Sequence, residues 1–110
     1  MTGPRSEVLQ GTLEMMVLKL LTREPSHGWG LSFRLREISR DVFDVNQGSL
    51  YPALQRLLRR GLVRSEWRAS DNNRRARYYE ITPAGRQALD AAVADWRRSS
   101  HAVNLVLRLA

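Results

Sequence analysis

The hydrophobic pattern of this 110-residue chain changes its period twice, and these changes fix the order of its elements. Apolar residues recur at helical spacing from Leu9 to Gly61, alternate with polar residues from Val63 to Thr82, and return to helical spacing up to about Leu109. Spacing of three or four residues predicts amphipathic helices, whereas alternation predicts half-buried strands. The chain is therefore expected to be mainly α, with a small β-hairpin before its last helix.

Three helices are expected before the hairpin. The first covers residues 9–21 and ends at the Glu-Pro-Ser sequence that follows, because the residue before a proline is disfavoured in helical conformation. The second covers residues 27–39. The third begins at a cap formed by Asn46 or Ser49 and closes at Gly61, which readily adopts the left-handed conformation.

Three further expectations concern the third helix. Residues 42–45, which lead into it, are expected to be a short extended piece. Pro52 fits the helix only in its first turn, where the missing N–H would have no partner. Its buried face is expected to consist of leucines, namely Leu50, Leu54, Leu57 and Leu58.

The hairpin and a long helix complete the predicted fold. Strands are expected at residues 63–68 and 74–82, joined by the turn-rich residues 69–73. Thr82 is then the N-cap of a helix with Pro83 at its first position. Three helices followed by a hairpin is the order of a winged helix-turn-helix, to which the last helix is an addition.

The last helix is too long to be covered by so small a domain. About 25 residues at 1.5 Å each form a rod of about 40 Å. Its apolar stripe therefore needs a partner, and a second copy of the chain is the simplest one. The stripe consists of Leu89, Ala92, Val93, Trp96, Val103 and Leu107. We expect residues 1–82 to form the winged helix-turn-helix DNA-binding domain, and residues 83–110 a C-terminal dimerisation helix that makes one compact unit with the first helix.

Positive charge is concentrated in the third helix and the hairpin. The chain carries a net charge of +7, and residues 46–79 hold eight arginines and two acidic residues, which accounts for +6 of it. Arginine presents a planar fork of donors that suits phosphates and guanine edges. A basic patch of this kind indicates a polyanion partner, although a solvated surface is the alternative for any single charged face.

The outer face of the third helix is suited to reading bases. On a helical wheel, Gln55, Arg56 and Arg59 fall opposite the leucines. Glutamine can read adenine and arginine can read guanine in the major groove of DNA. The arginines of the return strand suit backbone phosphates or a minor groove, as in the wing of a winged helix. They are Arg74, Arg75 and Arg77.

Several classes of function are not expected. The chain has no cysteine, and its two histidines lie 74 positions apart, so neither a disulfide nor a metal site is predicted. No apolar run approaches the roughly 18 residues of a membrane span, and the first residues lack the apolar core of a signal peptide. Glu14, Glu37 and Asp41 have no nucleophile or histidine beside them, so an enzyme is not expected. No cofactor is predicted.

The aromatic residues divide between core and interface. Trp29, Trp67 and Tyr79 are expected in the core, and Tyr51 is expected to be half-buried beside the leucine face. Trp96 lies on the apolar stripe of the last helix, so in a dimer it would face the seam. There it either packs as an ordinary interface residue or stacks against a flat aromatic ligand.

Several blocks of residues resemble the signature of the PadR family of bacterial transcriptional regulators. The blocks are Leu9–Glu14, His27–Gly30, Gln47–Leu54, Leu57–Val63 with Trp67, and Asn72–Gly85, so the resemblance covers residues 8 to about 98. Residues 102–108 resemble a subgroup with a single C-terminal helix. Trp29 stands where the family often has tyrosine, and Ala76 stands where it often has a basic residue.

The resemblance implies a homodimeric, ligand-responsive regulator, usually a repressor, that binds a palindromic operator in double-stranded DNA. It implies that the third helix enters the major groove and that the wing contacts the backbone. The implied DNA-binding residues are Ser49, Tyr51, Pro52, Gln55, Arg56, Arg59, Arg74, Arg75 and Arg77. The first and last helices would build the dimer, with Leu13, Leu89, Val93, Trp96, Val103 and Leu107 at its interface. Trp96 is also the candidate for binding a small hydrophobic or aromatic effector.

Two readings of the basic face remain. The first is a sequence-specific DNA-binding regulator in the cytoplasm, associated with the nucleoid when bound. The second is a winged-helix interaction module that binds an acidic protein or structured RNA. They differ in whether substitutions on the third helix change sequence preference or only weaken binding overall.

Overall fold

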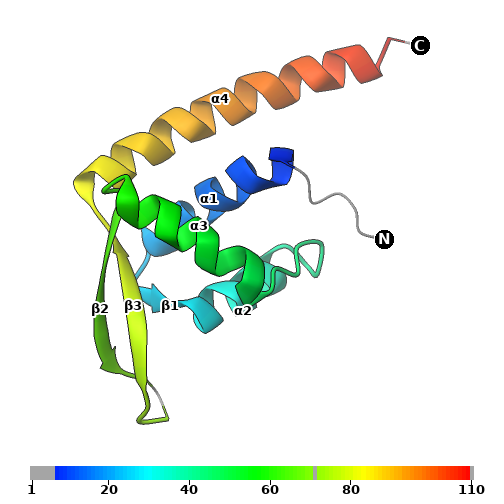
Figure 1. Ribbon diagram of the computed structural model, residues 1–110. Coiled ribbons are helices and arrows are strands. Elements are labelled where there is room, and N and C mark those ends of the chain that lie inside the picture. Colours follow the sequence, from blue (N-terminus) through cyan, green and yellow to red (C-terminus); the bar gives the residue numbers. More distant parts are fainter. Residues whose placement is uncertain (1–6, 71, 110) are drawn as a thin grey trace.

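The computed structural model describes residues 7–70 and 72–109, with side chains from Gly11 onward. It confirms a mainly helical fold with one small antiparallel sheet (Figure 1). The elements are α1 (Glu7–Leu21), β1 (Ser26–His27), α2 (Gly28–Ile38), α3 (Gln47–Arg59), β2 (Val63–Ala69), β3 (Arg75–Ile81) and α4 (Pro83–Leu107). Helix α1 begins at Glu7, two residues before the predicted start at Leu9, and residues 1–6 lie outside the described residues.

The core lies where α1, α2 and α3 pack together and meet the base of the sheet. Three of its leucines and one valine are completely inaccessible to water: Leu31, Leu50, Leu57 and Val17. On α3 the buried positions follow the predicted helical spacing, except that Leu58 is only partly buried and Ala53 takes a place in the core. Removing this apolar surface from water is the main stabilising contribution to the fold.

The sheet has three strands in the order β1-β3-β2, all antiparallel. Strand β2 pairs with β3 along its whole length, from Val63 opposite Ile81 to Ala69 opposite Arg75. Strand β1 was not predicted, because two residues are too few to show any alternation. It pairs with β3 through Ser26 and His27 and ties the start of α2 to the hairpin.

The extended piece predicted at residues 42–45 is wrong. These residues form an irregular loop after Arg40 and Asp41, both of which have left-handed backbone angles (φ 55° and 67°). The loop is held by a hydrogen bond from Ser32 Oγ to the carbonyl of Val45 (2.9 Å). The segment does not belong to the sheet, whose strands are β1, β2 and β3.

Helix α3 begins and ends as its caps require, but the position predicted for Pro52 is wrong. Asn46 is the N-cap, and its side chain accepts a hydrogen bond from the N–H of Ser49 (2.9 Å). Gly61 follows the helix with φ +73°. Pro52 is the sixth helical residue and lies in the second turn. Because proline has no N–H, the carbonyl of Gly48 lacks its usual helical donor.

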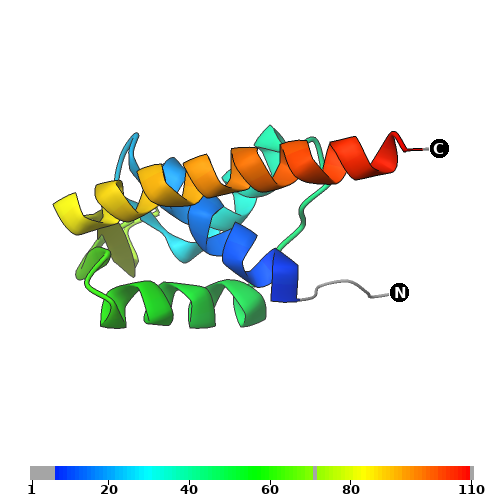
Figure 2. The ribbon, with the colours of Figure 1, turned by 90° about the horizontal axis from the view of Figure 1, so that it is seen from above.

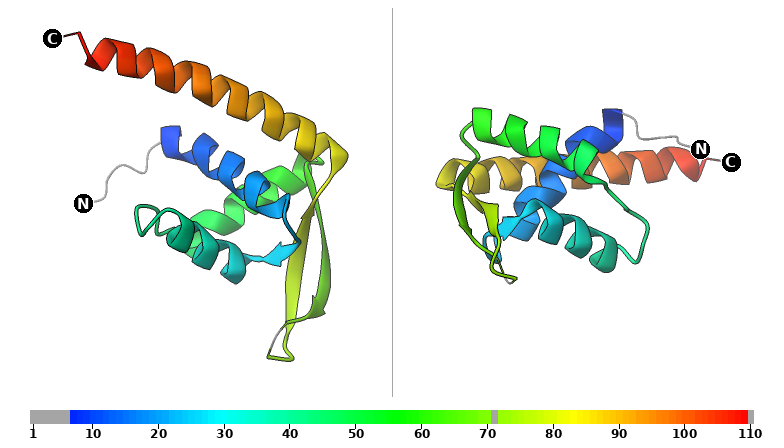
Figure 3. Two further views of the ribbon diagram at one scale, coloured as in Figure 1. Left: turned by 180° about the vertical axis from the view of Figure 1, so that it is seen from behind. Right: turned by 60° about the horizontal axis from the view of Figure 1, so that its bottom comes forward.

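Helix α4 starts at the predicted cap and crosses over α1. Thr82 accepts a hydrogen bond from the N–H of Gly85 (3.0 Å), and Pro83 is the first helical residue. Viewed from above, α4 spans the molecule with α1 running obliquely beneath it (Figure 2). Its C-terminal end extends past the other helices (Figures 1 and 3).

Two tryptophans expected inside are exposed instead. Trp29 and Trp67 expose 70% and 55% of their surface. Trp67 shares a hairpin face with Val63, which is buried, but the hairpin projects beyond the helices, so the core does not reach its outer half (Figure 1). The alternating pattern correctly placed Trp67 on the same face of the strand as Val63. It could not predict how far along the strand the helices cover that face.

Candidate nucleic-acid interface

The face of α3 that points away from the core carries most of the residues proposed to bind DNA. Ser49, Tyr51, Pro52 and Arg59 are all exposed there. Tyr51, which was expected to be half-buried, exposes 56% of its surface. The opposite face of the helix is filled by leucines, so the outer face is positioned by the packing of the core.

Two of the predicted base-reading residues already have partners within the chain. Gln55 is partly buried and forms a side-chain hydrogen bond with Tyr79. Arg56 forms an ion pair through its Nε with Glu14 of α1. Both side chains therefore lie closer to the body of the domain than the helical wheel suggests.

Glu14 joins α1 to the outer side of α3. Its second carboxylate oxygen lies 3.3 Å from Nη1 of Arg60, and its side chain is only 15% exposed. Sequence reasoning missed this ion pair because 42 residues separate Glu14 from Arg56. The one available signal was an acidic residue in the middle of a mainly apolar helix, in a chain with excess arginine.

The hairpin separates its charges between two faces. On the outer face, Arg64 and Arg68 pair with Glu80 and Glu66 at 3.4 and 2.9 Å. The inner face, which is turned toward α3, carries Trp67 with Arg75 and Arg77. Because side chains alternate along a strand, these residues continue the row that begins with buried Val63 and Ile81. The core thus sets the direction in which the wing arginines point.

Trp67 supports the two arginines beside it. The guanidinium carbons of Arg75 and Arg77 lie 5.3 and 5.7 Å from the centre of its ring, within the range of cation–π attraction. Nε of Arg77 also donates a hydrogen bond to Ser65 Oγ (2.9 Å). Within the described residues, no carboxylate pairs with Arg74, Arg75 or Arg77. They therefore present positive charge that the described part of the chain does not neutralise.

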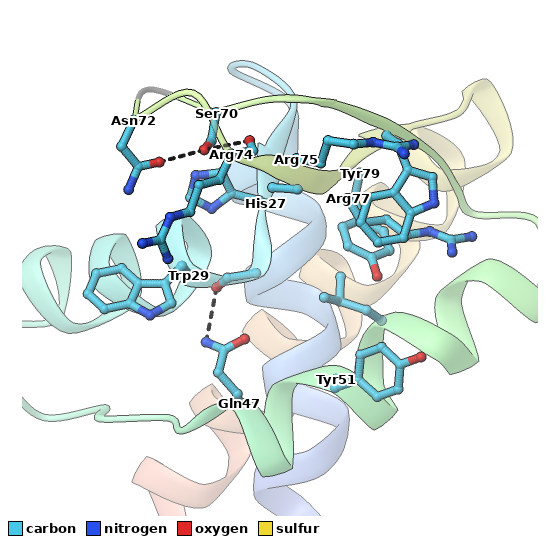
Figure 4. A pocket seen from close by; sticks show the side chains of 14 residues that line it. His27, Trp29, Gln47, Tyr51, Ser70, Asn72, Arg74, Arg75, Arg77 and Tyr79 are labelled. Carbon is cyan, nitrogen blue, oxygen red and sulfur yellow. Dashed lines mark hydrogen bonds between the residues drawn. The ribbon is translucent and has the colours of Figure 1, made fainter.

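A pocket of about 770 Å³ lies between the hairpin and the N-terminal ends of α2 and α3. We call it the wing groove. It is lined by His27, Gly28, Trp29, Gln47, Tyr51, Leu54, Trp67, Ser70, Asn72, Arg74, Arg75, Ala76, Arg77 and Tyr79. Figure 4 shows the hairpin arginines on one side and the side chains of Gln47 and Tyr51 on the other. Of the predicted DNA-binding residues, the structure brings Tyr51 and the three wing arginines together here.

Local hydrogen bonds fix the inner walls of the wing groove. Nδ1 of His27 accepts the N–H of Gly30 (3.0 Å), so this histidine serves as the N-cap of α2. Nε2 of Gln47 donates to Ser32 Oγ (2.8 Å) and to the carbonyl of Gly28 (3.3 Å). These bonds join the starts of α2 and α3. Gln47 was not singled out from the sequence, since its partners belong to α2 and the sequence does not reveal the path of the loop that joins the two helices.

Tyr79 closes the floor of the wing groove as a neutral phenol. Burial raises the pKa of its hydroxyl above the ordinary value of 10.0, while Arg77 and the hydrogen bond with Gln55 partly offset this rise. The side chain is 3% exposed, which confirms its predicted place in the core.

The residues predicted to form a dimer interface lie along one stripe of α1 and α4, with increasing exposure toward the C-terminus. Leu13 and Leu89 are 5% exposed and already packed within the chain, and Val93 is partly buried. Trp96, Val103 and Leu107 are 46%, 55% and 73% exposed. The outer part of the stripe is therefore left uncovered by its own chain.

Two other kinds of site were searched for in the described part of the chain. No group of three or more histidines and carboxylates is arranged to hold a metal ion. No helix combines the length and apolar character needed to cross a bilayer.

The comparison with a family model and the comparison with individual proteins point to the same kind of protein. A family model described as the transcriptional regulator PadR-like family matches residues 17–91. The transcriptional regulator Rv3488 of Mycobacterium tuberculosis is 39% identical over 83 residues, which cover 76% of this chain and 74% of that protein.

Solved structures show the same similarity over nearly the whole chain. A PadR-like transcriptional regulator from Bacillus cereus is 31% identical with a TM-score of 0.78, and the match covers 93% of this chain and 97% of that one. A PadR family transcriptional regulator from Eggerthella lenta is 32% identical with a TM-score of 0.80, over 94% and 88% of the two chains.

Proposed function

This chain belongs to the PadR-like family of transcriptional regulators, and from that premise we propose that it is a homodimeric repressor of transcription. As a member of a family of regulators it is not an enzyme, and the family implies that it binds DNA. In our proposal, residues 1–82 bind a palindromic operator in the cytoplasm, and residues 83–110 form the dimerisation helix.

One observation carries the proposal more than any other. Among the described residues, three hairpin arginines have no carboxylate partner, and they are on the same side of the hairpin as the exposed face of α3: Arg74, Arg75 and Arg77. A helix and a wing that present positive charge in one direction fit a major groove and the adjacent backbone of duplex DNA. The paired arginines of the outer hairpin face, Arg64 and Arg68, would have no such role.

The remaining residues are assigned roles that follow from their positions. Ser49, Pro52, Gln55, Arg56 and Arg59 would approach base edges or adjacent phosphates in the major groove. For Gln55 and Arg56 this requires exchanging an internal partner for DNA. Trp96 would face its symmetry mate in the dimer, where two indoles provide a site for a flat hydrophobic effector.

The proposal is tested by comparing substitutions on α3 and on the two faces of the hairpin. Arg56→Ala should change which base is preferred within the operator. Arg75→Ala should weaken binding to all duplexes and lower the slope of log affinity against log salt by about 1. Arg64→Ala is the matched control, since this arginine pairs with Glu80, and it should change neither property.

Binding is measured by fluorescence anisotropy with a labelled duplex from the region upstream of the gene and with a random duplex. Affinity for the upstream duplex should fall steeply with salt. Equal binding to both duplexes at physiological salt would contradict the proposal. Equal, sequence-independent losses from Arg56→Ala and Arg75→Ala would instead favour a module that binds acidic protein or RNA.

A further inference from the structure

Two exposed indoles line the wing groove from different elements. Trp29 comes from the first turn of α2 and Trp67 from the outer half of β2. Each exposes more than half of its surface, although burying an aromatic side chain is favourable. Neither is needed for the core, and both lie away from the apolar stripe of α4. The pair therefore suggests a surface that another molecule covers.

The charge of the wing groove restricts what that molecule is. Three arginines line it, and none of the described residues that line it is a carboxylate. The groove is also bordered by the N-terminal ends of two helices, α2 at Gly28 and α3 at Gln47, where backbone N–H groups favour negative charge. The occupant should be an anion with an apolar part that can lie against indole.

The shape of the site favours a strand over a small ion. The wing groove has a volume of about 770 Å³, far more than one phosphate requires. Tyr51 belongs both to this groove and to the exposed face of α3, so the two surfaces are continuous. A strand that combines phosphates with the apolar faces of sugars matches a groove that combines arginines with indoles.

We propose that the wing groove holds the sugar–phosphate backbone of one strand of duplex DNA, with Trp29 and Trp67 packed against deoxyribose. The arginines Arg74, Arg75 and Arg77 bind the flanking phosphates, while the indoles exclude water and hold the strand between α3 and the wing. This inference rests on the proposed function and adds Trp29 and Trp67 to its contact residues. Since sugars carry no sequence information, the two tryptophans contribute affinity and not specificity.

The chain's three tryptophans allow a direct test by fluorescence. Three single-tryptophan proteins are made by changing the other two tryptophans to phenylalanine. On adding upstream duplex, acrylamide quenching of Trp29 and of Trp67 should fall by about threefold, because each indole becomes covered. Trp96, on α4, is the internal control and should keep its quenching constant.

A second measurement separates sugar packing from charge. Trp29→Ala should weaken binding to upstream and random duplex alike by about tenfold, the equivalent of 1.4 kcal/mol. It should leave the salt slope unchanged, whereas Arg77→Ala should lower the slope by about 1. Phe33→Ala, at an exposed aromatic of α2 that does not line the groove, is the matched control and should bind normally.

The outcomes distinguish the inference from the function on which it rests. If the labelled duplex binds with sequence preference but Trp29 and Trp67 remain as quenchable as before, the inference fails and the proposed function stands. If no duplex binds above the random control, both fail. If Trp29→Ala changes sequence preference, the indole reads bases, and packing against the sugars is contradicted.

Discussion

Glu14 is the carboxylate that Arg56 and Arg60 share. It contacts both guanidinium groups and is largely shielded from water, so the attraction is stronger than that of an exposed pair. The same contact joins α1, which lies under α4, to α3. In the proposed complex this carboxylate would compete with DNA phosphates for the two arginines.

Substitution of Glu14 is expected to strengthen DNA binding and weaken the fold. Glu14→Gln removes the negative charge beside Arg56 and Arg60, so affinity for duplex should rise by about threefold at low salt. The free energy of unfolding should fall by about 1 kcal/mol, because the partly buried Arg56 and the exposed Arg60 each lose an ion pair. Anisotropy and urea denaturation measure the two effects.

The control for this substitution is Glu37→Gln, which removes an exposed carboxylate of α2. It should leave stability unchanged. An equal rise in affinity for both variants would mean that net charge alone matters, and the specific competition of Glu14 would be contradicted.

The first turn of α4 shows how an element is fixed by a single close approach. Gly85 is buried, and a Cβ there would overlap the carbonyl oxygen of Leu62 and lie 2.7 Å from Cγ1 of Ile81. That carbonyl also accepts the N–H of Thr82 (3.1 Å), so it has little freedom to move. The direction of α4 relative to the hairpin thus depends on residue 85 being a glycine, which has no side chain.

Gly85→Ala is therefore expected to destabilise the protein although alanine favours helices. The overlap involves backbone, which cannot turn aside, so we expect a loss of about 3 kcal/mol. Gly11→Ala, in α1 with nothing within 4 Å of the added methyl group, should instead stabilise by about 0.5–1 kcal/mol. Thermal unfolding followed by circular dichroism measures both. A loss at Gly85 no larger than 0.5 kcal/mol, within the usual range of a surface change, would contradict the argument.

Elements with strong periodicity were predictable, and those set by tertiary contacts were not. The four helices and the hairpin follow from apolar spacing and from caps such as Asn46, Thr82 and Gly61. Strand β1 exists only because β3 offers it an edge. The helix face that carries Gln55 and the strand face that carries the wing arginines were predictable. The ion pair with Glu14 that draws Arg56 toward α1 was not.

The whole molecule is more extended than its length requires. Its radius of gyration is 15.2 Å and its extents are 56 × 33 × 21 Å, whereas a compact domain of this length would have a radius of about 13 Å. The excess comes from α4, whose outer stripe is exposed at Trp96, Val103 and Leu107. A large exposed apolar patch of this kind marks an interface.

A charge within the stripe is expected to separate the proposed dimer. Val103→Asp would place an unpaired carboxylate in an apolar interface, so dimerisation should weaken by about a hundredfold, or about 3 kcal/mol. Ala102→Asp, one position along and on the opposite side of α4, is the control and should leave the dimer intact. Sedimentation equilibrium measures the difference. Equal association of both variants would mean that the stripe is not the interface.

The continuous row from Val63 and Ile81 to Trp67 and Arg75 also limits how this wing can evolve. Inserting one residue in β2 before Trp67 would turn every later side chain of that strand to the other face, sending Trp67 outward and Arg68 inward. An insertion of two residues would restore the alternation and only lengthen the wing. Changes in wing length that preserve the interface should therefore accumulate in steps of two within the strands, and single-residue changes should be confined to the tip between Ser70 and Arg74.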